Sequence, residues 1–305
     1  MVAVEPTIEV LVCTFRRPHL RSTLESLAAQ ALPPGLSIEV IVADNDDTPS
    51  AKDAVEAMAR RFPHPLRYVH APARNVSIAR NACLAAATAP WVAFLDDDET
   101  ASAGWIAALW RAAQETEADA VFGPVLAEYP PGAPAWMVRL DVHSTRPAPR
   151  AGVLETGYAG NVLMRRGNAP WAALRFDTSK GQTGGEDTAF FFAAHRLGAT
   201  FAEAPDAVVR EPVTPERLSF RWLARRRFRK GQTYAGTSRT GEGWAASGRL
   251  GLLLAATAKG TACGLAALAV LPWGERRRFW TLRGLLHAGV VAGCLSIPEA
   301  RLYGD

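Results

Sequence analysis

The chain has 305 residues, of which 49% are hydrophobic, so it can bury a large core in one domain or two smaller ones. The formal net charge of +4 is too small for the chain as a whole to be a polyanion-binding protein. The four cysteines are widely scattered and form no Cys-x-x-Cys pair, which argues against a zinc or disulfide scaffold and favours a reducing compartment. No basic-then-apolar segment opens the sequence, so we expect the chain to start in the cytoplasm.

The first half of the sequence alternates predicted strands with predicted helices. Short apolar runs predict strands at residues 8–13, 38–43, 66–70 and 91–95, with a helix in each interval between them. The first helix follows Pro18 and has the apolar stripe Leu20, Leu24, Leu27 and Ala31. The third is capped by Asn75 or Ser77. This order is typical of a doubly wound, mostly parallel sheet with helices on both faces, so we predict an α/β fold.

The fourth predicted strand, Trp91–Leu95, runs directly into the acidic residues Asp96–Glu99. Parallel sheets bind ligands at the carboxyl ends of their strands, where these acids lie. Adjacent aspartates repel one another, and a divalent cation with open positions for substrate phosphates relieves that repulsion. Side chains alternate along an extended segment, so Asp96 and Asp98 are expected to point the same way. The alternative is a solvated acidic loop in which Thr100 caps the next helix.

Polar residues also follow the first two predicted strands. Thr14 and Arg17 come after the first strand and Asp44 after the second, so the topology predicts that they converge with the acids. Asp44 either accepts hydrogen bonds from a ribose or a uracil ring, or closes its own loop as an Asx turn. Arg80, on the following helix, either reaches a phosphate or base or forms a surface ion pair.

The second half continues with a predicted helix around Trp105–Ala113 and strands at residues 119–126, 157–164 and 201–209. Proline-rich residues 130–150 predict a long loop over the site. A glycine-rich loop then leads to Glu186 and Asp187 at the start of a helix, where the dipole stabilises negative charge. These acids either include a catalytic base or cap the helix. The expected core face of that helix is Phe190, Ala194 and Leu197.

The C-terminal part of the chain is basic and then apolar. Seven basic residues between Glu216 and Lys230 predict an amphipathic helix that binds a diphosphate or anionic lipid. Nucleic-acid binding and a merely solvated face are the alternatives. Residues 250–271 and 279–297 predict a helical pair with Arg276–Arg278 between its members. Lys259 opposes insertion of the first segment, so a pair resting on a membrane surface is favoured over a span or ordinary packing.

Four segments together resemble one enzyme family. They are Thr14-Phe15-Arg16-Arg17-Pro18, Ala43-Asp44-Asn45, Ser77-Ile78-Ala79-Arg80-Asn81 and Phe94-Leu95-Asp96-Asp97-Asp98-Glu99. With Gly185-Glu186-Asp187 and Arg225–Gln232, they resemble the GT-A glycosyltransferases of family 2, which have a Rossmann-like fold. Within that family the resemblance is closest to the succinoglycan-type β-glucosyltransferases of bacterial exopolysaccharide biosynthesis. It implies a nucleotide-sugar donor, Mn²⁺ or Mg²⁺, and inversion at the anomeric carbon.

The resemblance also implies roles for individual residues. Asp98 and Asp96 are expected to hold the metal ion, with Asp96 also near the ribose. Asp187 is expected to deprotonate the acceptor hydroxyl and Glu186 to orient the acceptor. The residues expected to contact the nucleotide sugar are Thr14, Phe15, Arg17, Asp44, Asn75, Arg80, Asp96, Asp97, Arg226 and Arg227.

One position departs from the family pattern. Arg210 stands where relatives often carry a histidine that completes the metal shell. Either Glu211 or water then supplies the remaining ligand, or Arg210 meets the diphosphate directly. The third metal ligand is therefore left open.

The expected function is an inverting, metal-dependent transfer of one sugar, glucose from UDP-glucose, to a lipid-diphosphate-linked oligosaccharide. Residues 1–240 form the expected catalytic domain, with a nucleotide-sugar half (1–126) and an acceptor half (127–240); residues 241–305 form the peripheral tail. The expected location is the cytoplasmic face of the bacterial inner membrane, with no nucleic-acid partner. The alternatives are a non-catalytic nucleotide-sugar-binding scaffold, or a transferase that uses another donor such as UDP-glucuronate or GDP-mannose.

Overall fold

The computed structural model describes residues 6–150, 152–167, 169–238 and 246–298. The described residues form two compact units. The first comprises residues up to Glu128, His143–Gly181 and Ala189–Pro212, and the second comprises Tyr129–Val142, Gln182–Thr188 and the residues from Val213 onward. The expected boundary between residues 240 and 241 lies outside the described residues. The functional division at residue 126 stays a prediction.

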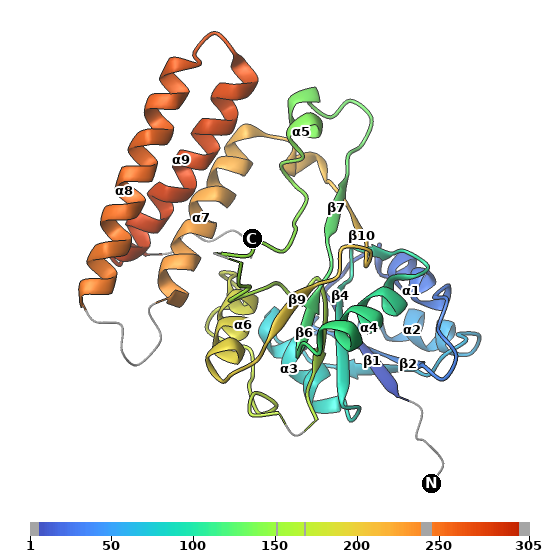
Figure 1. The fold of residues 1–305 in the computed structure, drawn as a ribbon. Helices are drawn as coiled ribbons and strands as arrows, with labels where there is room; N and C mark the ends of the chain where they lie inside the picture. The colour runs from blue at the N-terminus through green and yellow to red at the C-terminus, as the bar shows by residue number, and fades with distance from the viewer. Residues whose placement is uncertain (1–5, 151, 168, 239–245, 299–305) are drawn as a thin grey trace. The chain divides into compact units, whose positions relative to one another are not determined.

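The described strands of the first unit are organised around a seven-stranded sheet (Figure 1). Across the sheet they are β3 (Leu66–His70), β2 (Ser37–Asp44), β1 (Thr7–Thr14), β4 (Trp91–Asp96), β8 (Asn161–Arg165), β6 (Ala120–Phe122) and β9 (Phe201–Glu203). Strands β1 to β4 pair in parallel, whereas β8 is antiparallel to both of its neighbours. The predicted α/β fold with a mostly parallel sheet is confirmed.

Both faces of this sheet are covered by helices, so its strands carry apolar residues on both sides. The helices on one face are α1 (Leu20–Ala28), α2 (Lys52–Ala59) and α4 (Trp105–Thr116). Those on the other are α3 (Val76–Ala86) and, from Ala189 onward, α6 (Glu186–Arg196). Along β1, Val10 and Val12 belong to the first core and Leu11 to the second, as the alternation of a strand requires.

The strand order reverses at β1. The chain passes from β1 outward to β2 and β3, and then returns to place β4 on the other side of β1. Cys13 of β1 is the register partner of Asp96 of β4. The carboxyl ends of these two strands therefore border a topological switch point, which is where open α/β sheets bind ligands.

Two strands predicted as continuous are each divided between two sheets. Residues 119–126 form β6 and β7 (Val125–Glu128), and residues 201–209 form β9 and the start of β10 (Val209–Pro212). Strands β7 and β10 join β5 (Thr100–Ala101) in a three-stranded sheet of order β5-β10-β7. Between β6 and β7, a Cβ on Gly123 would lie 2.2 Å from the carbonyl oxygen of Ala207. This close approach is where both segments leave the first sheet.

Two further expectations about residue positions are wrong, and so is one alternative considered from the sequence. Ala31 lies beyond the end of α1 and is exposed, because the helix stops at Ala28. Leu197 follows α6 and is 46% exposed, so it does not belong to the core face. Thr100 lies in β5, whereas α4 begins at Trp105, so the cap considered at Thr100 is absent.

The proline-rich segment and the next strand also differ from expectation. Residues 130–150 include a helix, α5 (Ala135–Leu140), because Trp136 and Met137 are buried in the core of the second unit. Strand β8 begins at Asn161, later than predicted from residue 157.

In the second unit, α7 (Phe220–Ser238), α8 (Ala246–Ala269) and α9 (Gly274–Cys294) lie side by side (Figure 1). A short 3-10 turn, Pro215–Arg217, precedes α7, which starts later and runs further than the predicted basic helix. The predicted C-terminal helical pair is present as α8 and α9. A Cβ on Gly289 of α9 would lie 1.9 Å from the carbonyl oxygen of Phe228 of α7, so these two helices touch through their backbones.

Asn161 connects the elements around the split strands. Its side chain is fully buried, and its Oδ1 accepts a hydrogen bond of 2.8 Å from Trp105 Nε1. Its Nδ2 donates to the carbonyl oxygens of Pro124 (3.0 Å) and Ala207 (2.7 Å). One amide thus ties α4 to the two points where the chain passes between sheets.

We expect Asn161→Leu to lower the free energy of unfolding by about 3 kcal/mol, because three buried polar groups lose their partner. Chemical denaturation monitored by circular dichroism measures this change. Gln114→Ala, at an exposed position of α4, is the control and should change stability by no more than about 0.5 kcal/mol. Equal stability of the two variants would contradict the role assigned to Asn161.

Candidate functional site

The acidic residues at the end of β4 differ in how far they reach solvent. The Asp96 side chain is 42% exposed, whereas those of Asp98 and Asp97 are 17% and 11% exposed. Arg17, from the loop after β1, approaches both of the latter, with its Nη2 3.8 Å from Asp98 Oδ2 and its Nε 3.9 Å from Asp97 Oδ1. The loops after β1 and β4 are thus brought together, as their positions in the sheet predict.

Arg80 lies in the interior beside Asp96. It is 6% exposed, its Nη2 is 3.3 Å from Asp96 Oδ1, and its guanidinium lies 5.4 Å from the ring centroid of Phe176. The surface ion pair considered from the sequence is wrong for Arg80, because its guanidinium is buried, although the Asp96 side chain that it meets is partly exposed. Arg80 thus contacts Asp96, the most exposed of these aspartates, from its buried side.

Gly160 leaves room for two of the carboxylates. A Cβ at this position would lie 2.7 Å from Glu99 Oε1 and 3.1 Å from Asp96 Oδ2. Glu99 Oε2 also accepts a hydrogen bond of 3.1 Å from the Asp96 backbone. Burial, together with repulsion from Asp96 and Glu211, raises the pKa of Glu99 well above its ordinary value. Sequence reasoning identified the small residues before β8 but not the carboxylates that they face.

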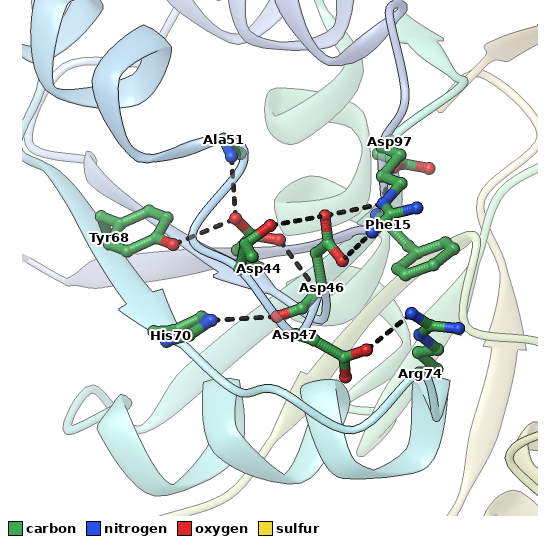
Figure 2. Close-up of polar contacts among 11 residues, drawn as sticks. Phe15, Asp44, Asp46, Asp47, Ala51, Tyr68, His70, Arg74 and Asp97 are labelled. Atoms are coloured by element: carbon green, nitrogen blue, oxygen red, sulfur yellow. Dashed lines mark hydrogen bonds and ion pairs between the residues drawn. The ribbon is translucent and has the colours of Figure 1, made fainter.

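Asp97 points into the protein. Its Oδ2 accepts a 3.4 Å hydrogen bond from the Phe15 backbone (Figure 2), and its carbonyl accepts one of 3.0 Å from Thr23 Oγ1. Burial raises the pKa of Asp97 to about 7; Thr14 and Arg17 lower this pKa, whereas the neighbouring aspartates raise it. Asp97 thus fixes the loop after β1 against the acidic segment.

Asp44 is completely buried, and its contacts close the loop after β2. Its Oδ1 accepts from the Asp46 backbone (3.1 Å), and its Oδ2 accepts from the Ala51 backbone (2.8 Å) and Tyr68 Oη (3.0 Å). Figure 2 shows these contacts around the carboxylate. Of the two roles considered for Asp44, the Asx turn is present.

Asp46 was missed by sequence reasoning, although it directly follows the quoted Ala43-Asp44-Asn45 segment. Arg16 binds both of its carboxylate oxygens, with an Nε to Oδ2 distance of 2.7 Å and an Nη2 to Oδ1 distance of 2.8 Å. The Arg16 guanidinium holds the pKa of this carboxyl well below its usual range. His70 Nε2 donates to the Asp46 carbonyl at 2.9 Å (Figure 2). The loops after β1 and β2 are thereby joined.

Asn75 caps α3 and fastens a distant segment. Its Oδ1 accepts from the Ile78 backbone at 3.3 Å, so Asn75, not Ser77, provides the cap. Its Nδ2 donates to the Thr178 carbonyl at 2.8 Å, and Ser77 Oγ donates to the Asp177 carbonyl at 2.9 Å. The start of α3 therefore holds the segment that leads toward residue 181.

Four predicted site residues belong to the second unit. Glu186 and Asp187 begin α6; Glu186 is 6% exposed, and Asp187 Oδ1 accepts from the Thr188 backbone at 2.6 Å. On α7, the Arg226 guanidinium lies 5.1 Å from the Trp222 ring centroid. Arg227 Nη2 donates to the Val142 carbonyl at 3.3 Å, and burial lowers the pKa of Arg227.

The residues after β1 and β4 fit a hard divalent cation. Asp96 and Asp98 offer oxygen ligands, which such ions prefer. Within the described residues, no three His, Cys, Asp or Glu side chains gather as a complete metal shell. Thr14 Oγ1 is buried beside Asp97 and has no hydrogen bond of normal geometry among the described residues. The protein ligands thus suit an ion that takes its other ligands from substrate or water.

Arg210 does not replace the missing histidine as a metal ligand. Its side chain is 54% exposed, and its Nε lies 3.9 Å from Glu128 Oε1. The neighbouring Glu211 lies close enough to Glu99 to raise the pKa of that carboxyl. Arg210 is positively charged and cannot donate electrons to a metal ion.

The family model of glycosyl transferase family 2 matches residues 9–169. The chain is 46% identical over 298 residues to the succinoglycan biosynthesis protein ExoM of Rhizobium meliloti (strain 1021), covering 97% of this chain and 96% of ExoM.

Two solved structures share the fold. The mannosyltransferase PcManGT from Pyrobaculum calidifontis, in complex with GDP-Man and Mn²⁺, has a TM-score of 0.64 at 20% identity, covering 97% of this chain and 89% of that chain. Staphylococcus aureus TarS 1-349, in complex with UDP-GlcNAc, has a TM-score of 0.55 at 16% identity, covering 94% of this chain and 91% of that chain. The chain spans 55% of the longer TarS chain.

The sheet with its switch point has the GT-A fold of these solved structures, and the protein is a glycosyltransferase. The chain belongs to glycosyl transferase family 2.

The raised pKa of Asp97 predicts a pH-dependent stability. The folded protein keeps this proton up to about pH 7, whereas the unfolded chain releases it near pH 4. Raising the pH through this window therefore lowers the free energy of unfolding, because the unfolded state binds fewer protons. Asp97→Asn removes this contribution, which is on the order of a few kcal/mol.

Thermal unfolding between pH 5 and pH 8 in the presence of EDTA measures this effect. We expect Asp97→Asn to gain stability relative to the wild type as the pH rises. Asp53→Asn, at an exposed position in the first turn of α2, should follow the wild type throughout. Parallel curves for the wild type and Asp97→Asn would refute the assignment.

Proposed function

We propose that this protein is an inverting, metal-dependent glycosyltransferase that transfers a single glucose from UDP-glucose to a lipid-diphosphate-linked oligosaccharide in succinoglycan-type exopolysaccharide biosynthesis. The observation that carries the proposal is the acidic segment at the switch point, with Asp96 open to solvent and Asp98 beside it. The name of the similar ExoM supports the pathway, and the Mn²⁺ in PcManGT supports the metal. The UDP-sugar in TarS 1-349 supports the nucleotide.

The donor is proposed to lie across the ends of β1 and β4. Asp96 and Asp98 would hold Mn²⁺ or Mg²⁺, which when bound neutralises charge on the nucleoside diphosphate. Thr14 Oγ1 has hydrogen-bonding capacity to offer the donor, and Arg17 brings positive charge to the same end of the sheet. Phe15, which is 38% exposed, offers its ring to the base.

The remaining predicted donor residues act mainly through the loops that they hold. Asp44 shapes the loop after β2, and its full burial favours an indirect role in base binding. Asn75 holds the start of α3, and Arg80 orients Asp96. Asp97 anchors the Phe15 backbone.

The acceptor hydroxyl is proposed to lose its proton to Asp187 as its oxygen attacks the anomeric carbon. The bond between that carbon and the diphosphate oxygen breaks on the opposite side, so the configuration inverts. Glu186 is proposed to orient the acceptor. Arg226 and Arg227 are proposed to favour departure of the nucleotide, because guanidinium groups bind phosphate oxygens well.

The C-terminal helices are proposed to rest on the cytoplasmic face of the inner membrane. The most apolar 18-residue window of Gly248–Ala269 has a mean hydropathy of 1.6, and 11% of that window is buried within the structure. By length and composition it is the candidate membrane span within the described residues. Arg276–Arg278 follow the exposed Leu271 and Trp273, and this pairing of charge and apolar surface suits an anionic membrane interface. A lipid-linked acceptor would be found at that surface.

Thermal stability with UDP, GDP, CDP and dTDP, each with and without Mn²⁺, tests the donor site. We expect UDP with Mn²⁺ to raise the melting temperature, because a ligand that binds only the folded state stabilises it. Asp98→Ala should abolish the shift, whereas Asp53→Ala on α2 should retain it. No shift with any nucleotide in folded wild-type protein would contradict the proposal and favour a scaffold. A melting-temperature shift with GDP or dTDP alone would assign the donor to that nucleotide in place of UDP.

Sedimentation with vesicles containing phosphatidylglycerol tests the membrane surface. Replacing Arg276, Arg277 and Arg278 together by Gln should weaken binding about 100-fold, since each charge contributes about 1 kcal/mol near an anionic surface. Arg60→Gln with Arg61→Gln, two exposed positions after α2, is the control and should bind as the wild type does. Undiminished binding of the triple variant would exclude this surface.

A further inference from the structure

We propose that Arg229 of α7 is a positioning residue for the transfer reaction, holding the loop that leads to Glu186 and Asp187 in the conformation that transfer requires. This inference rests on the proposed role of Asp187 as the base. It assigns to the C-terminal helices a part in the reaction beyond contact with a membrane.

Arg229 is an interior arginine that binds backbone oxygens. It is 2% exposed, and its Nε and Nη2 donate to the Thr183 carbonyl at 3.2 and 2.9 Å. The same Nη2 donates to the Gly184 carbonyl at 3.1 Å. Hydrogen bonds from a charged donor are stronger than neutral ones, and the planar guanidinium fixes the direction of both carbonyls.

The loop that Arg229 holds has a restricted backbone. Gly184 and Gly185 have φ values of +84° and +88°, a region that residues with a side chain rarely adopt. A Cβ on Gly185 would lie 2.4 Å from Cγ2 of Thr233, which is one turn after Arg229 on α7. One face of α7 therefore both hydrogen-bonds the loop and contacts its last glycine. The next residues are Glu186 and Asp187.

The position of α7 is in turn fixed by α9. A Cβ on Gly231 would lie 2.1 Å from the Leu286 carbonyl oxygen, and one on Gly293 would lie 2.7 Å from the Cβ of Ala235. With Gly289, these glycines let the two helices approach at backbone distance along two turns. Gly231 lies two residues after Arg229, so the packed section of α7 is the one that carries the guanidinium.

A general base acts only within hydrogen-bond reach of the proton that it takes. A displacement of about 1 Å can lower a rate by about 100-fold. Arg229 binds backbone oxygens of the loop, so its loss should lower kcat of transfer. The groups proposed to hold the donor, Asp96, Asp98 and Thr14, belong to the first unit, so donor affinity should be retained.

The test measures transfer of radiolabelled glucose from UDP-glucose into the lipid fraction of Rhizobium meliloti membranes from cells that lack ExoM. Arg229→Met removes the donors, and Arg229→Lys keeps one charged donor. Asp187→Asn tests the base itself. The control is Arg111→Met, at an exposed arginine that pairs with Asp206 at 2.8 Å. Each variant is also tested for its melting temperature and its UDP affinity.

We expect Arg229→Met to lower kcat by about 10- to 100-fold, with UDP affinity and KM for UDP-glucose within about twofold of the wild type. Arg229→Lys should recover part of the lost kcat, and Arg111→Met should retain it. A purely structural role would instead lower the melting temperature and the active fraction equally in both Arg229 variants. If Arg229→Met does not fold, Arg229→Lys carries the test, with a reduced kcat and unchanged UDP affinity as the expected result.

The outcomes separate the inference from the proposed function. Loss of transfer in Asp187→Asn with unchanged kcat in the Arg229 variants would overturn the inference and leave the proposed function standing. Transfer retained by Asp187→Asn, or absent from the wild-type protein, would overturn the proposed base and the inference with it.

Discussion

The removal of like charges from water at the end of β4 is the constraint on which the candidate site of the first unit depends. Asp96, Asp97, Asp98 and Glu99 are consecutive, and two of them are almost wholly removed from water. Burial of like charges is costly, so the structure compensates in several ways. Arg80 and Arg17 supply positive charge, and backbone N–H groups donate to Asp97 and Glu99. Burial first, and then the neighbouring carboxylates, raise the pKa values of these last two carboxyls.

The compensation also determines which acid is available to a ligand. Asp97 and Glu99 point into the protein and are held by backbone groups, whereas Asp96 is open and supported by Arg80 from the interior. The loops after β1 and β2 are joined by Arg16 and Asp46. The groups that offset the cost of burying the acidic segment therefore also form the surface on which a donor would lie. The contacts that compensate the buried charges are therefore also the contacts that form the candidate site.

Much of the fold could be predicted because the first strands and helices follow local patterns. Strand β4 carries a continuous apolar run, β1 and β2 are mostly apolar, and Asn75 has the residue type that caps helices. The division of residues 119–126 and 201–209 between two sheets depends on Asn161, which is distant from both in sequence. No local pattern encodes such a contact. Leu197 and Ala31 continue a helical period past the point where the helix has ended.

The same distinction applies to the candidate site. Residue type identified the acids and Thr14, because carboxylates and hydroxyls suit a cation and a phosphate. The structure adds what those residues touch: Asp44 closes a loop, Arg80 is buried, and Gly160 faces two carboxylates. Arg229 is one of several arginines in a basic run, and the sequence of that run does not distinguish this buried arginine from its exposed neighbours. Its hydrogen bonds to carbonyl oxygens of a loop more than forty residues earlier distinguish it from those neighbours.

The place of β8 in the sheet bears on how much of the chain is needed to complete the acidic site. This strand arrives late in the chain, yet it lies antiparallel between β4 and β6, and Gly160 just before it borders Asp96. Residues up to 126 therefore do not include Gly160, which borders the acids, or β8, without which β4 would be an open sheet edge. The family match ends at residue 169, just beyond β8. The family match thus spans the sheet together with its returning strand, and a fragment that ended before β8 would lose the strand that lies beside the acids.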